Sequence, residues 1–133
     1  MVQKPAAGPA ARPLSPHLQI FRWPITMTTS ILHRMTGVAL GGGALLIAWW
    51  LIAAATGADA YGFFAHYANE WYGRIVLFVF TVFLVFHLLN GIRHLVWDTG
   101  RGFEVKTANR SGLLVIVLTV LLTIGLWALG YWV

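Results

Sequence analysis

Two short segments of this sequence concentrate side chains that could do chemistry in otherwise apolar surroundings. The first covers residues 30–36 and reads SILHRMT, and the second covers residues 87–98 and reads HLLNGIRHLVWD. Imidazole nitrogens can ligate a metal ion, while hydroxyl and guanidinium groups can hydrogen-bond carbonyl or carboxylate oxygens. Ionisable groups are costly inside a membrane, so these two segments indicate a functional site if the surrounding chain spans a bilayer.

The composition indicates that the chain does span one. Of its 133 residues 59% are hydrophobic and only 10% are charged, and the mean hydropathy is +0.74, whereas a soluble domain carries about 25% charged residues. Residues 35–55, 75–92 and 111–133 form runs without charge, each close to or above the ~18 to 20 residues that cross a bilayer. Because hydrocarbon cannot satisfy backbone polar groups, we expect helices.

The predicted fold is therefore an all-α membrane protein with three transmembrane helices, over approximately residues 30–55, 70–97 and 110–132. Prolines at positions 5, 9, 13, 16 and 24 prevent a regular helix before roughly residue 25. We expect residues 1–28 to form an extended segment along the surface of a partner, and residues 29–133 to form the membrane domain. The same prolines interrupt any apolar core of a signal peptide, so none is expected.

The charge pattern predicts the orientation. The formal net charge is +5, but the positive residues are spread over loops, which favours a topology signal over nucleic-acid binding. Lys and Arg precede the first run and flank the connection between the second and third, whereas the first connection holds Asp59, Glu70 and Arg74. We therefore place the N-terminus and the second connection in the cytoplasm and the C-terminus on the opposite side, which puts both polar segments in one leaflet.

The second segment continues a narrow stripe on one helix face. At ~100° per residue one side of the helix carries a set of aromatic, imidazole, glycine and carboxylate positions, namely Phe80, Phe83, His87, Gly91, His94 and Asp98. Such a stripe suits a flat ligand: His87 lies deep, roughly 16 Å along the axis from Asp98, and Gly91 would let a macrocycle approach. His33 is expected to lie too shallow to share an iron with His87.

Structural roles compete with each of these interpretations. Arg34 can extend to lipid phosphates, His33 and His87 can bond neighbouring helices, and His94 with Asp98 can form an ordinary interfacial pair. The Gly37-x-x-x-Gly41 pattern favours close helix packing rather than phosphate binding. The chain has no cysteine, which excludes disulfides and thiolate-held clusters within it.

Together the motifs resemble the cytochrome b membrane-anchor subunits of succinate dehydrogenase. The resemblance extends over nearly the whole chain in the number and order of spans. Two motifs carry it: Arg12-Pro13-Leu14, Leu18 and Ser30-x-x-His33-Arg34-x-Thr36; and His87-x-x-x-Gly91-Ile92-Arg93-His94-Leu95-x-Trp97-Asp98-x-Gly100.

The resemblance implies a role in a four-subunit complex. A flavoprotein would oxidise succinate, an iron–sulfur subunit would pass the electrons to ubiquinone, and a second anchor subunit would pack beside this chain in the lipid. The isolated chain would have no activity, and no nucleic acid would be involved. The cytoplasmic side would dock the iron–sulfur subunit through the apolar residues Leu14, Leu18, Ile20, Phe21 and Trp23.

The resemblance also assigns the site residues, and it alone identifies the cofactor as haem. His87 would be one axial ligand of a single haem b, with the other ligand supplied by the partner anchor. Ser30 and Arg34 would line the quinone site. Polar contacts to the haem propionates would come from His33, Arg34, Arg93 and His94, and Gly91 and Phe83 would pack against the ring.

Three alternatives stay open from the sequence. They are a fumarate reductase anchor, an anchor that has lost its haem, and a small non-redox membrane protein such as a transporter. The sequence shows no internal repeats or broken helices, which argues against the transporter. Since no Arg- and Ser-rich transit peptide is evident, we expect the bacterial inner membrane, with the mitochondrial inner membrane as the alternative.

Overall fold

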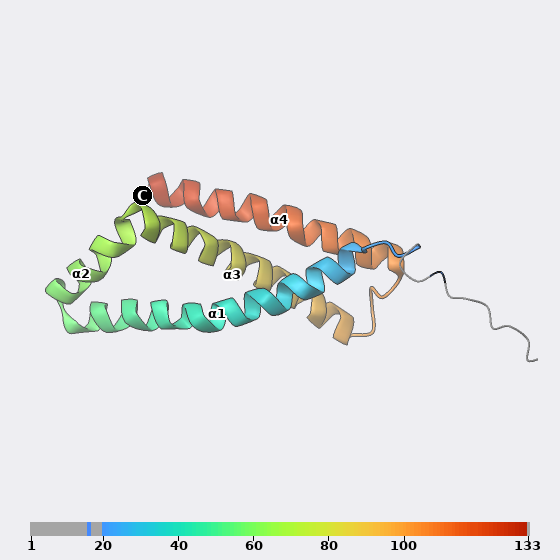
Figure 1. Ribbon diagram of the computed structural model, residues 1–133, viewed down its shortest axis with the longest axis horizontal. Coiled ribbons are helices and arrows are strands. Elements are labelled where there is room, and N and C mark those ends of the chain that lie inside the picture. Colours follow the sequence, from blue (N-terminus) through green and yellow to red (C-terminus); the bar gives the residue numbers. More distant parts are fainter. Residues whose placement is uncertain (1–15, 17–19, 133) are drawn as a thin grey trace, which may run out of the picture.

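The computed structural model describes residue 16 and residues 20–132, with no side-chain description for the last of these. Four helices account for most of this part: α1 (Ile25–Thr56), α2 (Ala58–Asn69), α3 (Trp71–Asp98) and α4 (Val105–Trp132) (Figure 1). Three of them, at Ile25–Thr56, Trp71–Asp98 and Val105–Tyr131, are long and apolar enough to cross a membrane. The expectation of an all-α chain with three candidate membrane spans is confirmed.

The helix ends follow from local chemistry. α1 begins directly after Pro24, whose carbonyl accepts hydrogen bonds from the amides of Met27 and Thr28. This start lies before the approximate position 30 that was predicted for the first span, because the polar threonines of the first turns are helical too. α1 ends at Thr56, and the next residue, Gly57, has a φ of +134°, which only glycine readily adopts.

The connection between the first two spans contains a helix that hydropathy did not indicate. α2 has 12 residues, too few to cross a bilayer, and Glu70 in an extended conformation separates it from α3. α2 bridges the ends of α1 and α3 where these two helices have diverged (Figure 1).

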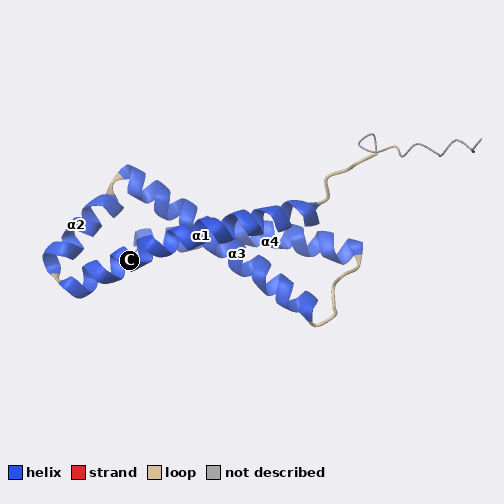
Figure 2. Cartoon of the chain, turned by 60° about the horizontal axis from the view of Figure 1, so that its bottom comes forward, coloured by secondary structure: helices blue, strands red, loops and turns tan. Residues whose placement is uncertain are grey.

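The three long helices form a splayed bundle. α4 lies along α3, and α1 crosses α3 in the half of the molecule that contains the start of α1 (Figures 1 and 2). Close approach of α1 to α3 depends on two glycines, since a Cβ at Gly37 would meet the ring of His87 and one at Gly43 would meet the ring of Phe80. Within the described residues, a Cβ at Gly41 would meet nothing within 4 Å, so only Gly37 of the Gly37–Gly41 pair lies close to another helix of this chain.

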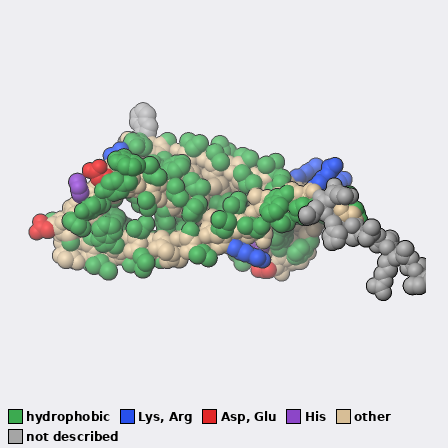
Figure 3. All heavy atoms as spheres, viewed as in Figure 1, with side chains coloured by type: hydrophobic (Ala, Val, Ile, Leu, Met, Phe, Trp, Pro, Cys, Tyr) green, Lys and Arg blue, Asp and Glu red, His purple; other side chains and the backbone are tan. Residues whose placement is uncertain are grey.

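The bundle buries few apolar side chains and an unusual share of polar ones. Within the described residues the buried polar side chains are Thr29, Thr36, Asn90, Arg93, Thr119 and Thr123. Large apolar residues face outward instead, including Val38 at 81% and Leu45 at 74% exposure. Figure 3 shows hydrophobic side chains over the middle of the molecule and Lys and Arg gathered at the end where α4 begins. This surface suits lipid and packed protein rather than water.

Candidate functional site

Three histidines meet where α1 crosses α3. The rings of His33 and His87 stack with centroids 3.9 Å apart and planes 13° from parallel, and the ring of His94 lies 5.1 Å from that of His33. His33 and His87 therefore lie at the same level, and the expectation that His33 is too shallow was wrong because α1 begins as early as Ile25. Parallel rings this close leave no space between them, so the pair does not sandwich a metal ion.

His87 is held by two adjacent residues of α1. Its Nδ1 lies 3.2 Å from Oγ1 of Thr36, and a Cβ on Gly37 would come within 3.1 Å of its Cε1. Within the described part of the chain, Nε2 of His87 forms no hydrogen bond. This nitrogen is therefore the atom of His87 that remains available to a ligand.

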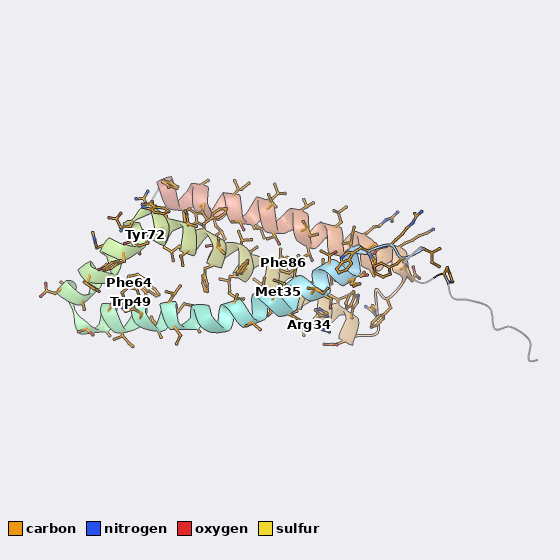
Figure 4. The ribbon with its side chains drawn as sticks, viewed as in Figure 1. Arg34, Met35, Trp49, Phe64, Tyr72 and Phe86 are labelled. Carbon is orange, nitrogen blue, oxygen red and sulfur yellow. The ribbon has the colours of Figure 1, made fainter. Side chains whose placement is uncertain are left out.

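Ser30 and Arg34 lie one helical turn apart on α1, beside His33. Ser30 is half-buried and Arg34 is exposed, and Figure 4 shows Arg34 on the part of α1 that passes the end of α3. Neither side chain hydrogen-bonds another residue that the structure describes. Their hydroxyl and guanidinium groups are thus available to an external oxygen atom.

Arg93 occupies a different environment from the one predicted for it. Only 6% exposed, its guanidinium donates to Oγ of Ser111 at 2.9 Å, Oγ1 of Thr29 at 3.1 Å, Oδ1 of Asn90 at 3.2 Å and the carbonyl of Ala108 at 2.9 Å. These bonds use four of the five N–H groups of arginine and connect α3 with α1 and α4. The guanidinium also lies 4.0 Å from the ring centroid of Trp97. Arg93 thus joins the helices, and only one of its five N–H groups remains for a haem propionate.

Sequence reasoning did not identify Thr29, Asn90 and Ser111 as partners of Arg93. The available signal was that each is a polar residue within or beside an apolar run. However, the three residues come from three different helices. Only the crossing of the helices shows that they converge on one guanidinium.

Replacing Arg93 by Leu should destabilise the bundle. Four hydrogen bonds would be lost, three of them to other helices, and at about 0.6 to 1 kcal/mol for each interhelical bond the free energy of unfolding should fall by about 2 to 3 kcal/mol. Thermal unfolding of the detergent-solubilised chain, followed by circular dichroism, measures this. Arg101→Leu, at an exposed position between α3 and α4, is the control. Equal stability of the two variants would contradict the role of Arg93.

Gly91 and Phe83, which were also predicted for the site, lie on α3 together with His94. His94 packs edge-on against Trp97 with centroids 5.1 Å apart, and it makes no ion pair with Asp98. A Cβ on Gly91 would meet nothing within 4 Å, so the space beside it is open, and Phe83 is half-buried. Nδ1 of His33 is buried and has no hydrogen-bond partner in the part of the chain that the structure describes.

Other features of the described residues do not compete with this site. No group of three or more His, Cys, Asp or Glu side chains in that part is placed to hold a metal ion. A cavity of about 620 Å³ lies at the other end of the bundle, between α3 and α4, and its lining includes Arg74, Trp127 and Tyr131. It contains none of the predicted site residues. Trp49 of α1, Phe64 of α2 and Tyr72 of α3 also lie at that end (Figure 4).

Comparison with known proteins adds independent evidence. A family model described as the succinate dehydrogenase/fumarate reductase transmembrane subunit matches residues 9–126. The chain is 45% identical over 116 residues to the succinate dehydrogenase cytochrome b556 subunit of Rickettsia felis, covering 87% of this chain and 90% of that one. It is 43% identical over 113 residues to the protein of the same name from Paracoccus denitrificans, covering 85% and 87%.

A mitochondrial protein is similar as well. The succinate dehydrogenase cytochrome b560 subunit of Mus musculus is 39% identical over 122 residues, covering 89% of this chain and 71% of the mouse protein. Matches of this extent, together with the three candidate membrane spans, establish the family. The chain belongs to the cytochrome b membrane subunits of the succinate dehydrogenase complex.

Proposed function

We propose that this subunit ligates haem b through His87 and forms part of the site at which ubiquinone is reduced, with Ser30 and Arg34 as quinone-binding residues. One observation carries the proposal. The crossing of α1 and α3 brings His87 and His94 against His33, which lies within one turn of Ser30 and Arg34 on α1. A candidate ligand and two hydrogen-bonding side chains therefore lie in the same part of the bundle.

The residues present fit a haem. Among the described residues, Nε2 of His87 has no hydrogen bond, the space beside Gly91 is open, and Nδ1 of His33 is buried without a partner. His33, Arg34 and His94 would face the propionates, while Phe83 and Gly91 would border the ring. When bound, haem b supplies one-electron redox chemistry at this level of the membrane.

A second ligand for the haem would come from outside the described residues of this chain. His33 stacks on the face of His87, so these two imidazoles would not hold one iron between them. We therefore assign the second ligand to the partner anchor subunit. That subunit would cover part of the apolar surface that the bundle exposes. A haem bound by both anchor subunits would also fix how they pack against each other.

The quinone would be held by complementary donors. The hydroxyl of Ser30 and the guanidinium of Arg34 can each donate a hydrogen bond to a quinone carbonyl oxygen. The positive charge of Arg34 stabilises that oxygen as negative charge develops on it during reduction. Because no described carboxylate pairs with Arg34, this charge is available to the substrate.

Orientation and partners follow the charge distribution. Arg22, Arg101, Lys106 and Arg110 lie at the end where α1 and α4 begin, which we place in the cytoplasm of a bacterium. The histidine site, formed by His33, His87 and His94, lies nearer this end. The iron–sulfur subunit would therefore deliver electrons here, after receiving them from the flavoprotein. In a mitochondrion, as for the mouse relative, the same end would face the matrix.

Purifying the complex through a tag on this chain tests the proposal. We expect the flavoprotein, the iron–sulfur subunit and a second anchor to copurify. The complex should have succinate:ubiquinone reductase activity and should contain about one haem b for each flavin. A complex that reduces fumarate with a quinol much faster than it oxidises succinate would favour the fumarate reductase alternative. An active complex without haem would contradict the assignment of His87.

A further inference from the structure

The hydroxyl of Thr36 lies between the backbone of its own helix and the imidazole of His87. Thr36 is 5% exposed, and its Oγ1 lies 2.8 Å from the carbonyl oxygen of Leu32, 3.0 Å from that of His33 and 3.2 Å from Nδ1 of His87. A hydroxyl has one proton to donate and lone pairs with which to accept. Which neighbour receives that proton decides the state of the imidazole.

The distances favour donation to the backbone. Both carbonyl oxygens of α1 are closer to Oγ1 than Nδ1 is, and threonine within a helix commonly donates to the carbonyl three or four residues earlier. With its proton on the backbone, Oγ1 can only accept from His87. Nδ1 of His87 then carries the proton of the neutral ring, and the lone pair is on Nε2.

We propose that Thr36 is a positioning residue that fixes His87 in the Nδ1–H tautomer and so presents Nε2 as a metal ligand. The inference rests on the proposed function, in which His87 ligates haem iron. A hydrogen bond from the second nitrogen of a ligating histidine sets both its orientation and its basicity. Thr36 would supply that bond with a neutral hydroxyl, inside the membrane, where a carboxylate would be costly.

Gly37 completes the arrangement. The ring of His87 can reach Oγ1 of Thr36 because position 37 has no side chain, since a Cβ there would lie 3.1 Å from Cε1 and 3.8 Å from Nδ1. His33 packs on the ring face at 3.9 Å. The imidazole is thus fixed by a hydrogen bond at one edge, by backbone beside it and by a second ring on its face.

Thr36→Val tests this inference, because valine keeps the branched shape and removes the hydroxyl. The measurements are the haem content of the purified complex and the midpoint potential of its haem by redox titration. Loss of the bond should make His87 a less basic ligand, which raises the potential, and should weaken haem retention by about ten- to a hundredfold. Thr36→Ser, which keeps a hydroxyl, should stay close to the wild type in both measurements.

Thr119→Val is the matched control. Thr119 is also buried, at 6% exposure, and donates to the carbonyl of Val115 at 2.7 Å, but none of the described histidines hydrogen-bonds its hydroxyl. If Thr36→Val and Thr119→Val have the same haem content and potential, the role of Thr36 is overturned. If valine prevents assembly, Gly37→Ala replaces it, because the added methyl displaces the ring while Thr36 stays, and an unchanged potential in that variant overturns the inference.

Failure of this inference is distinguishable from failure of the proposed function. A wild-type complex without haem would contradict the assignment of His87 itself. A wild-type haem that survives unchanged in Thr36→Val would leave His87 as the ligand and remove only the role of the hydroxyl.

Discussion

Arg34→Ala should reduce succinate-driven reduction of a short-chain ubiquinone by about ten- to a hundredfold while leaving reduction of an artificial dye by succinate unchanged. A hydrogen bond to a charged group contributes about 1.5 to 3 kcal/mol, and each 1.36 kcal/mol of transition-state stabilisation changes a rate tenfold. The dye takes electrons before they reach the quinone, so its reduction reports the flavoprotein and iron–sulfur subunits alone. Parallel assays of both acceptors on the purified complex make the measurement.

Ser30→Ala should act in the same direction with a smaller effect, about two- to tenfold, because a bond between neutral groups contributes about 0.5 to 1.5 kcal/mol. Arg34→Lys keeps the charge without the planar donor array and should fall between wild type and Arg34→Ala. Arg101→Ala, at an exposed position beyond α3, is the charge-matched control. Equal loss of both activities in Arg34→Ala would indicate failed assembly and would contradict a quinone-specific role.

His87→Ala should remove the haem or change its visible spectrum, because the only imidazole assigned to the iron from this chain would be gone. The haem content, determined as pyridine haemochrome relative to flavin, should fall well below the wild-type ratio. The reduced-minus-oxidised difference spectrum should lose or shift its b-type bands. Succinate–dye activity should persist, since the flavoprotein and iron–sulfur subunits would still function.

His66→Ala is the matched control for this prediction. His66 is exposed on α2, at the end of the molecule away from the histidine site, so its removal should leave haem content and spectrum unchanged. An unchanged spectrum in His87→Ala would rule out His87 as the ligand. A loss in both variants would point to instability of the complex rather than to ligation.

Much of the fold could be predicted because it depends on properties that a sequence shows directly. The uncharged runs predicted three candidate membrane spans, and these are confirmed by α1, α3 and α4. The short helix α2 could not be predicted in this way, because hydropathy detects spanning length and α2 has only 12 residues. Likewise, the glycine that packs against Phe80 is Gly43 rather than Gly41, since the crossing of two helices selects the contact.

The candidate site could be predicted by residue type but not by arrangement. His33, His87 and His94 were identified because imidazoles inside apolar spans are rare and costly. The stacking of His33 on His87 depends on where α1 begins. Hydropathy did not indicate this start, because the first turns of α1 contain polar threonines. The separate environment of Arg93 depends on side chains from three helices, and no local pattern in the sequence joins them.

The central claim is that this subunit carries a haem b that electrons from succinate can reach. The most direct test is a reduced-minus-oxidised visible spectrum of the purified wild-type complex, recorded first with succinate and then with dithionite. We predict b-type bands that appear with dithionite and, in part or in full, with succinate. Absence of any b-type band with either reductant would contradict the account.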